Sequence, residues 1–367
     1  MRDQRYDLLF DPVKIGPLTA KNRFYQVPHC NGGGCRDPSA AAEMRRVKSE
    51  GGWGVIFTEQ VEIRHSSEIT PFIVLRIWDD DDIPALVMAE LLSDARDEVG
   101  DTCAIAVRLS LDELAGPKGF TNQELREVVH MHSDLPDLWD FAHGTWEACS
   151  GTSRFKPEAA QEDLIRGLKQ LTSKPVVGVG RFTSPDLMVP KVKQGLMDFV
   201  GAARPSIADP FLPQKIDQGL VEDIRECIGC NICVSSDMTQ SLSRCTQNSS
   251  FMEEWRKGWH PERIKPRSSE GKVLVVGAGP TGLSAAHKLG LRGYDVSLAE
   301  ADKELGGRVS LESKLPGLSA WARVRDYRVG QIDKMMNVNI YRDSQLSAAD
   351  VFEFGAEHIC IATGLWG

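Results

Sequence analysis

The stretch Lys272–Gly282, KVLVVGAGPTG, is a run of strand-forming residues that ends in three glycines with the spacing G-x-G-x-x-G. These glycines are Gly277, Gly279 and Gly282. In a strand–turn–helix unit this spacing permits a tight turn, lets the backbone approach a pyrophosphate, and lets the helix pack closely on the sheet. The helix amino terminus then favours the negative charge of the phosphates. The stretch therefore predicts a parallel α/β fold that binds a nucleotide.

The residues that follow continue this pattern. We predict a helix over 283–292 and a strand over 296–299. The strand ends at Glu300, an acidic residue placed to bind a ribose hydroxyl. The remaining alternative is a glycine-rich turn that binds no ligand.

Two later stretches, ELGG at 304–307 and ICIATG at 359–364, resemble further signatures of flavoproteins that bind two dinucleotides. In those proteins the nicotinamide nucleotide occupies a second domain, so we expect FAD or ADP here. We predict that residues 271–367 form the N-terminal part of a Rossmann-like FAD- or ADP-binding domain.

Four cysteines lie upstream in the stretch Glu226–Cys245, ECIGCNICVSSDMTQSLSRC. They are Cys227, Cys230, Cys233 and Cys245. Three cysteines on one short loop and a distant fourth are typical of iron–sulfur ligation, whereas zinc sites tend to pair cysteines two and two. We predict a [4Fe-4S] cluster in an irregular connector over 216–270, with a zinc site or free structural thiols as alternatives.

The first 215 residues alternate strand-like and helix-like stretches, which is typical of parallel α/β folds. The predicted strands are 23–28, 54–59, 104–108, 138–141, 176–181 and 199–204.

Composition narrows the function classes. The 367 residues are 41% hydrophobic and 26% charged, and the net charge of −9 argues against nucleic acid or an anionic membrane as the main partner. No apolar run approaches the length of a membrane helix, and the acidic residues near the start argue against a signal peptide. The nine cysteines suit a reducing cytoplasm. We expect a cytoplasmic protein with no nucleic-acid or membrane partner.

Several stretches together resemble the trimethylamine/dimethylamine dehydrogenase family. This group belongs to the old-yellow-enzyme-like flavoproteins, which also include the iron–sulfur 2,4-dienoyl-CoA reductases. The matching stretches are VPHC (27–30), SEGGWGVIFTEQ (49–60), VVGVGRF (176–182), GAARPSIADPFLPQKI (201–216), CIGCNIC (227–233), CTQN (245–248) and RKGWHPE (256–262). The resemblance implies an FMN-binding TIM-type (β/α)8 barrel over 1–215, with the iron–sulfur cluster near the flavin.

The resemblance also implies flavin-binding residues. The ends of the last two strands are expected to hold the FMN phosphate with free amides and two guanidinium groups. Arg108 matches the family arginine that faces the flavin ring; the alternative for each of the three arginines, taken alone, is a surface ion pair. Cys30 matches the cysteine that in amine dehydrogenases joins covalently to the flavin; the alternative is a buried apolar thiol. The expected phosphate residues are Gly180, Arg181, Ala203 and Arg204.

Three residues fall at family positions for the substrate. Gln60 replaces an aromatic residue of the bowl that holds a methylated ammonium by cation–π contact, as in the dimethylamine branch. Trp146 fits the second aromatic position, and Asp237 stands where a third aromatic is expected. No general base is named; His29 and His143 are weak candidates.

The family pattern breaks near residues 85–101, where we expect a helix over 86–92. Strands three and four of the barrel and their helices, on the order of a hundred residues, have no counterpart in the sequence. Six strands do not close with the tilt and shear of eight, so a partner chain, a rearrangement or an incomplete gene product would explain the break.

The resemblance implies oxidation of a methylated secondary or tertiary amine through FMN, with electrons leaving through the cluster to an electron-transfer protein. We also expect a homo-oligomer. The alternatives are an NADPH-dependent enoate or 2,4-dienoyl-CoA reductase and a degenerate, truncated relative without turnover.

Overall fold

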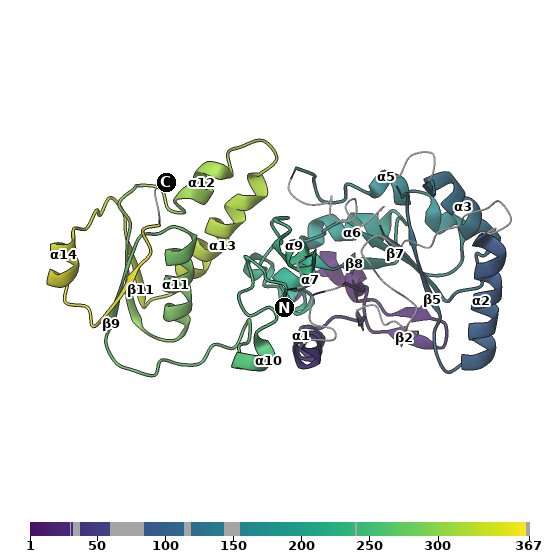
Figure 1. Cartoon of the computed structure of the whole chain (residues 1–367), viewed down its shortest axis with the longest axis horizontal. Helices are drawn as coiled ribbons and strands as arrows, with labels where there is room; N and C mark the ends of the chain where they lie inside the picture. The colour runs from purple at the N-terminus through teal and green to yellow at the C-terminus, as the bar shows by residue number, and fades with distance from the viewer. Residues whose placement is uncertain are drawn as a thin grey trace. The chain divides into compact units, whose positions relative to one another are not determined.

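A computed structural model describes residues 1–29, 31, 37–58, 84–113, 119–142, 155–238 and 241–364; at 84–91, 236–238 and 257 it describes the backbone alone (Figure 1). The chain divides into two compact units, Met1–Trp255 and Arg256–Gly367. The division falls inside the predicted connector, so the three-part domain scheme stays a prediction.

The first unit is built on a parallel sheet of six strands in the order β4-β3-β8-β7-β6-β5. All six predicted strands are present, which confirms the α/β fold class. Their bounds are β3 Phe24–Gln26, β4 Val55–Ile56, β5 Ala106–Ser110, β6 Leu138–Ala142, β7 Val176–Val179 and β8 Phe199–Ala202.

The sheet is an incomplete barrel. The first and last barrel strands, β3 and β8, pair with each other, as they do when a (β/α)8 barrel closes. Among the described strands, β4 pairs only with β3 and β5 only with β6, so the open edges lie where the third and fourth strands would stand.

Helices cover the outer face of this sheet. α3 begins with a capping box in which Thr121 accepts from the backbone of Glu124, and α6 begins at Pro185 after the capping residue Ser184. The helices are η1 Gln4–Phe10, α1 Pro38–Glu50, α2 Pro84–Val99, α3 Asn122–Met131, α5 Glu162–Ile165, η3 Leu168–Leu171, α6 Pro185–Lys193, α7 Arg204–Ala208, α8 Leu212–Gln218, η4 Val221–Asp223, α9 Ile232–Met238 and α10 Glu254–Lys257. Within the described ranges, none is long and apolar enough to cross a membrane.

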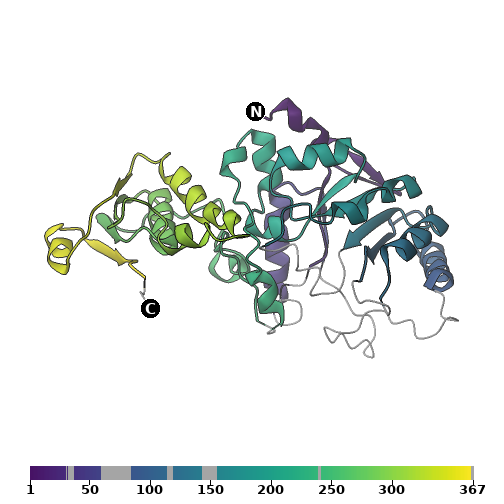
Figure 2. The ribbon, with the colours of Figure 1, turned by 90° about the horizontal axis from the view of Figure 1, so that it is seen from above.

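Helix α2 extends seven residues beyond the predicted end at residue 92 and lies beside β5 in both views (Figures 1 and 2). Its last turn is held by Arg96, which pairs with Asp137 and donates to the carbonyl oxygens of Gly100 and Cys103. These contacts come from the loop before β5 and from the residue directly before β6. The intrinsic helix propensity of α2 contains no information about them.

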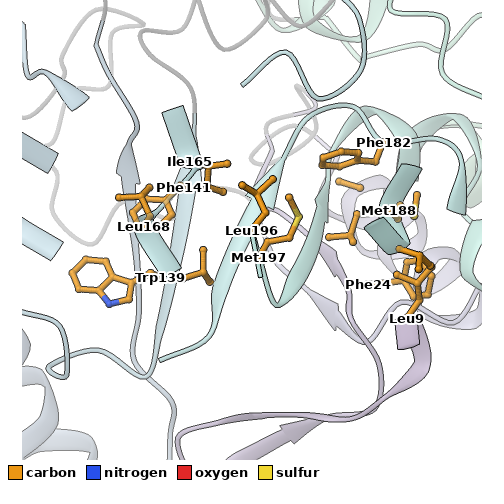
Figure 3. Close-up of a cluster of buried hydrophobic side chains, with 14 of the residues drawn as sticks. Leu9, Phe24, Trp139, Phe141, Ile165, Leu168, Phe182, Met188, Leu196 and Met197 are labelled. Carbon is orange, nitrogen blue, oxygen red and sulfur yellow. The ribbon is translucent and has the colours of Figure 1, made fainter. Parts of the chain in front are cut away.

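The main core lies between the sheet and these helices (Figure 3). Trp139 and Phe141 alternate with Asp140 along β6 and stack with ring planes 7° apart and centroids at 6.2 Å. Burying a large apolar side chain contributes about 1.5–3 kcal/mol, so this face fixes the register of β6. The opposite face of the sheet carries a second cluster, which the hairpin β1 Val13–Ile15 and β2 Leu18–Ala20 covers at one end.

The second unit has a parallel sheet in the order β11-β10-β9-β12, the order of a Rossmann-like fold. The predicted nucleotide strands are confirmed, but α11 begins three residues before the expected helix because Pro280 suits the first helical position. β11 was not predicted. The bounds are β9 Lys272–Val276, α11 Pro280–Leu291, β10 Asp295–Ala299, α12 Arg308–Glu312, η5 Ser319–Ala322, α13 Arg323–Ile332, β11 Val338–Tyr341, α14 Ala348–Glu353 and β12 His358–Ile361.

Candidate functional site

Strands β5 and β6 bring Arg108 and Asp140 together. The parallel register sets the two residues opposite each other. Nη1 of Arg108 lies 3.3 Å from Oδ2 of Asp140 and donates to the carbonyl oxygen of Pro28 over the same distance. The Asp140 side chain is 3% exposed, whereas that of Arg108 is 30% exposed. Arg108 is therefore anchored on a buried carboxylate and retains an exposed part that can contact a ligand.

Asp140 is only partly paired. Burial raises its pKa to about 6, against the opposing effect of the Arg108 guanidinium. Within the described part of the chain, Oδ1 of Asp140 and Oγ of Ser110 are buried without a hydrogen-bond partner. Ser110 lies two residues after Arg108 and so on the same face of the sheet. Because such orphaned atoms are rare in proteins, this corner fits the polar edge of a bound flavin ring.

His29, a weak catalytic candidate, lies at the end of β3 beside Lys48. Nζ of Lys48 is 2.8 Å from Nε2 of His29. Lys48 is fully buried, and burial, followed by the neighbouring Arg45, holds its pKa well below the usual range. One contact of His29 is therefore with an amine, whereas a general base is typically oriented by a carboxylate.

The two arginines expected at the flavin phosphate both reach the cysteine segment, residues 226–245. Nη1 of Arg181 donates to the carbonyl oxygen of Cys227 over 3.2 Å, and Nη2 donates to Lys156. Nη1 of Arg204 donates to Oδ1 of Asn231 over 2.7 Å. Gly180 and Ala203 directly precede these arginines at the carboxyl ends of β7 and β8.

The four cysteines of the segment are neighbours. Burial raises the pKa of the Cys233 thiol, and the other three thiols raise it further. The pKa of Cys245 is raised to about 12, mainly by burial. The Gly229 amide donates to Sγ of Cys227 over 3.4 Å. Four neighbouring thiols are the donor set of an iron–sulfur cluster.

Within the described residues no three His, Cys, Asp or Glu side chains are already arranged around a single metal ion.

The glycine turn of the second unit leaves room for a pyrophosphate. Gly277 has a φ of +97°, and a Cβ on Gly282 would lie 1.8 Å from the Gly277 carbonyl oxygen. A Cβ on Gly279 would meet no described atom within 4 Å, so that side of the turn is open. Glu300 lies against the same turn, since its Oε2 accepts from the Ala278 amide over 2.5 Å. The arrangement fits an ADP moiety.

Some predicted site residues lie outside the described residues: Cys30, Gln60, His143 and Trp146; at Asp237 the backbone alone is described.

Sequence reasoning missed Asp140 and Lys48. A carboxylate inside the apolar strand Leu138–Ala142 was the available signal for Asp140. For Lys48 the signal was its place on the apolar stripe of α1, four residues after Met44.

Comparison with known proteins gives matches over almost the whole chain. The signature of the "NADH:flavin oxidoreductase / NADH oxidase family" matches residues 8–89 and 87–223. A signature described as "NAD(P)-binding Rossmann-like domain" matches residues 275–329. The two parts of the first match meet inside α2, within the expected join.

Three relatives are similar to this chain over nearly all of its 367 residues. Dimethylamine dehydrogenase of Hyphomicrobium sp. (strain x) is 34% identical over 99% of this chain and 67% of its own. The solved histamine dehydrogenase from Rhizobium sp. 4-9 is 50% identical with a TM-score of 0.92, covering 98% of this chain and 69% of that one. The solved 6-hydroxypseudooxynicotine amine oxidase from Pseudomonas geniculata N1 is 40% identical with a TM-score of 0.93, covering 99% and 72%.

The alignment with dimethylamine dehydrogenase spans 494 positions against 367 residues here, so more than a hundred positions of that protein have no counterpart in this chain.

Proposed function

We propose that this chain, which belongs to the NADH:flavin oxidoreductase / NADH oxidase family, oxidises a methylated secondary or tertiary amine with FMN as cofactor. The observation that carries the proposal is its similarity, over nearly its whole length, to dimethylamine dehydrogenase and histamine dehydrogenase. FMN, when bound, supplies a hydride acceptor for the C–H bond next to the amine nitrogen.

The residues at the carboxyl ends of the barrel strands would hold the flavin. Arg108 directs positive charge toward the ring, and the buried Asp140 fixes its guanidinium from behind. Cys30 would form the covalent link. Gly180, Arg181, Ala203 and Arg204 would contribute amides and charge at the phosphate.

The amine would lie on Gln60, Trp146 and Asp237, where an aromatic face and a carboxylate both favour an ammonium group. We assign no general base. His29 lies beside the strand end, and its contact with Lys48 favours a role in orientation over proton transfer.

The remaining cofactors would serve the exit of electrons. Cys227, Cys230, Cys233 and Cys245 would hold a [4Fe-4S] cluster, which carries single electrons toward a protein acceptor. Gly277, Gly279, Gly282 and Glu300 would hold FAD or ADP. We further propose a cytoplasmic homo-oligomer.

Anaerobic rapid mixing of the flavin-loaded chain with dimethylamine or trimethylamine tests the proposal, and histamine, a primary amine, is compared with them. We expect loss of the flavin absorbance with dimethylamine or trimethylamine and no comparable loss with NADPH. A flavin that NADPH reduces and no amine reduces would favour the enoate reductase class. A chain with full FMN occupancy that responds to neither would be a binding protein without turnover.

A further inference from the structure

Arg181 and Arg204 connect the barrel to the cysteine segment. They follow adjacent strands, β7 and β8, and each donates to a different part of that segment. The Arg181 contact is the carbonyl oxygen of Cys227 itself, and the Arg204 contact is Asn231, which lies between Cys230 and Cys233. The two guanidinium groups therefore hold the loop that carries three of the four cysteines.

Arg181 occupies a backbone conformation that favours glycine. Its φ is +56°, which costs a residue with a side chain about 1–2 kcal/mol. The residue is nonetheless only 7% exposed, and its side chain is hydrogen-bonded at both terminal nitrogens. Strain of this kind persists where the surrounding contacts fix the residue, so the guanidinium has a defined place beside Cys227.

In the cysteine segment, Arg181 donates to a backbone carbonyl oxygen and Arg204 to a side-chain amide oxygen. Neither acceptor is charged, and arginine stays protonated in proteins, so both guanidinium groups bring positive charge to the segment. A cluster held by four thiolates carries net negative charge and gains one more negative charge when it accepts an electron. Positive charge beside it stabilises the reduced form more than the oxidised form, because the interaction grows with the charge.

We propose that Arg181 and Arg204 are positioning residues of the four-cysteine site, which fasten the cysteine segment to β7 and β8 and supply positive charge next to the cluster. The inference rests on the proposed function only in that the four cysteines hold a [4Fe-4S] cluster. It adds a role at the cluster to the role at the flavin phosphate that is proposed above for both arginines.

The test compares the full-length chain with Arg181→Gln and Arg204→Gln. The matched control is Arg126→Gln, because Arg126 in α3 also donates to backbone carbonyl oxygens, those of Leu164 and Arg166, none of them in the cysteine segment. Each protein is reconstituted anaerobically with iron and sulfide. The measurements are bound iron, the midpoint potential of the cluster in a dithionite titration followed by electron paramagnetic resonance, and FMN affinity by fluorescence quenching.

We expect a lower cluster potential in Arg181→Gln and Arg204→Gln and an unchanged potential in Arg126→Gln. Weaker FMN binding with unchanged cluster potentials would overturn the inference and leave both arginines at the phosphate. If a glutamine variant takes up no iron, the lysine variant at the same position, which keeps the positive charge, is measured. Restored iron uptake in the lysine variant supports the proposal, and continued loss of iron uptake contradicts it. A wild-type chain that forms no cluster would refute the cluster assignment itself, and amine-dependent flavin bleaching tests the remaining function separately.

Discussion

Asp140 is a carboxylate whose ionisation opposes folding. Its pKa in the folded chain is about 6, above the ordinary value of 3.8, because burial penalises the charge more than Arg108 favours it. Between these two pH values the folded chain holds a proton that the unfolded chain has released. Stability from this group is therefore full below about pH 4 and is lost as the pH rises through 6, by up to about 3 kcal/mol.

We predict that Asp140→Asn removes this pH dependence. Urea denaturation at pH 5 and pH 8, followed by tryptophan fluorescence, should show the variant gaining stability relative to wild type at pH 8. The asparagine side chain has the size of aspartate and does not ionise. Arg108 then loses its charged partner but remains partly solvated. An equal difference between the two pH values in both proteins would contradict the prediction.

The ionisation of Lys48 also opposes folding, because burial disfavours the charged amine. It lies on the buried stripe of α1, and its described hydrogen-bond partner is His29. We predict that Lys48→Met raises the free energy of unfolding by about 1–3 kcal/mol, because a buried polar group is replaced by an apolar one of similar length. Because Lys48 contacts His29, the residue before Cys30, the same variant should also lower the yield of covalently attached flavin, measured as flavin retained in the acid-precipitated pellet. A destabilised variant with normal attachment would show that Lys48 serves packing alone.

At the scale of the element, two glycines of the turn between β9 and α11 have different expected roles. Gly282 is expected to matter for folding and Gly279 for ligand binding. A Cβ on Gly282 would lie 1.8 Å from the Gly277 carbonyl oxygen, so Gly282→Ala should destabilise the second unit by about 1–3 kcal/mol. Gly279 has open space on its Cβ side. We predict that Gly279→Ala folds normally and binds ADP more weakly, because the methyl group occupies the space for the pyrophosphate.

Circular dichroism melting and ADP titration by calorimetry separate these two effects. Gly330→Ala in α13 is the control: its Cβ would meet nothing within 4 Å, and alanine favours a helix by about 0.5–1 kcal/mol. Normal ADP affinity in Gly279→Ala would place the nucleotide elsewhere.

At the scale of the whole molecule, the proposed cluster site and the proposed nucleotide site lie in different units. All four cysteines lie in Met1–Trp255, and the glycine turn lies in Arg256–Gly367. We predict two thermal transitions in scanning calorimetry. Removal of iron should lower one of them, and ADP should raise the other, because a ligand stabilises the unit that binds it. A single transition that moves with both ligands would contradict independent units.

Much of the fold was predictable because its signals are local. Apolar runs predicted the six barrel strands and the strand β9, and the spacing of glycines and cysteines predicts two further sites that stay predictions. The end of α2 and the position of β11 were not predictable, because contacts from distant residues decide them.

The sequence by itself determined the fold class, the family, and the residue types available for flavin, cluster and nucleotide, since each follows from a short contiguous pattern. The tertiary structure alone decided which side chains meet. Arg108 reaches Asp140 across 32 positions and Arg181 reaches Cys227 across 46. Strand register and burial create these pairs, and neither has a signature within one segment, because both depend on what the rest of the chain packs against it.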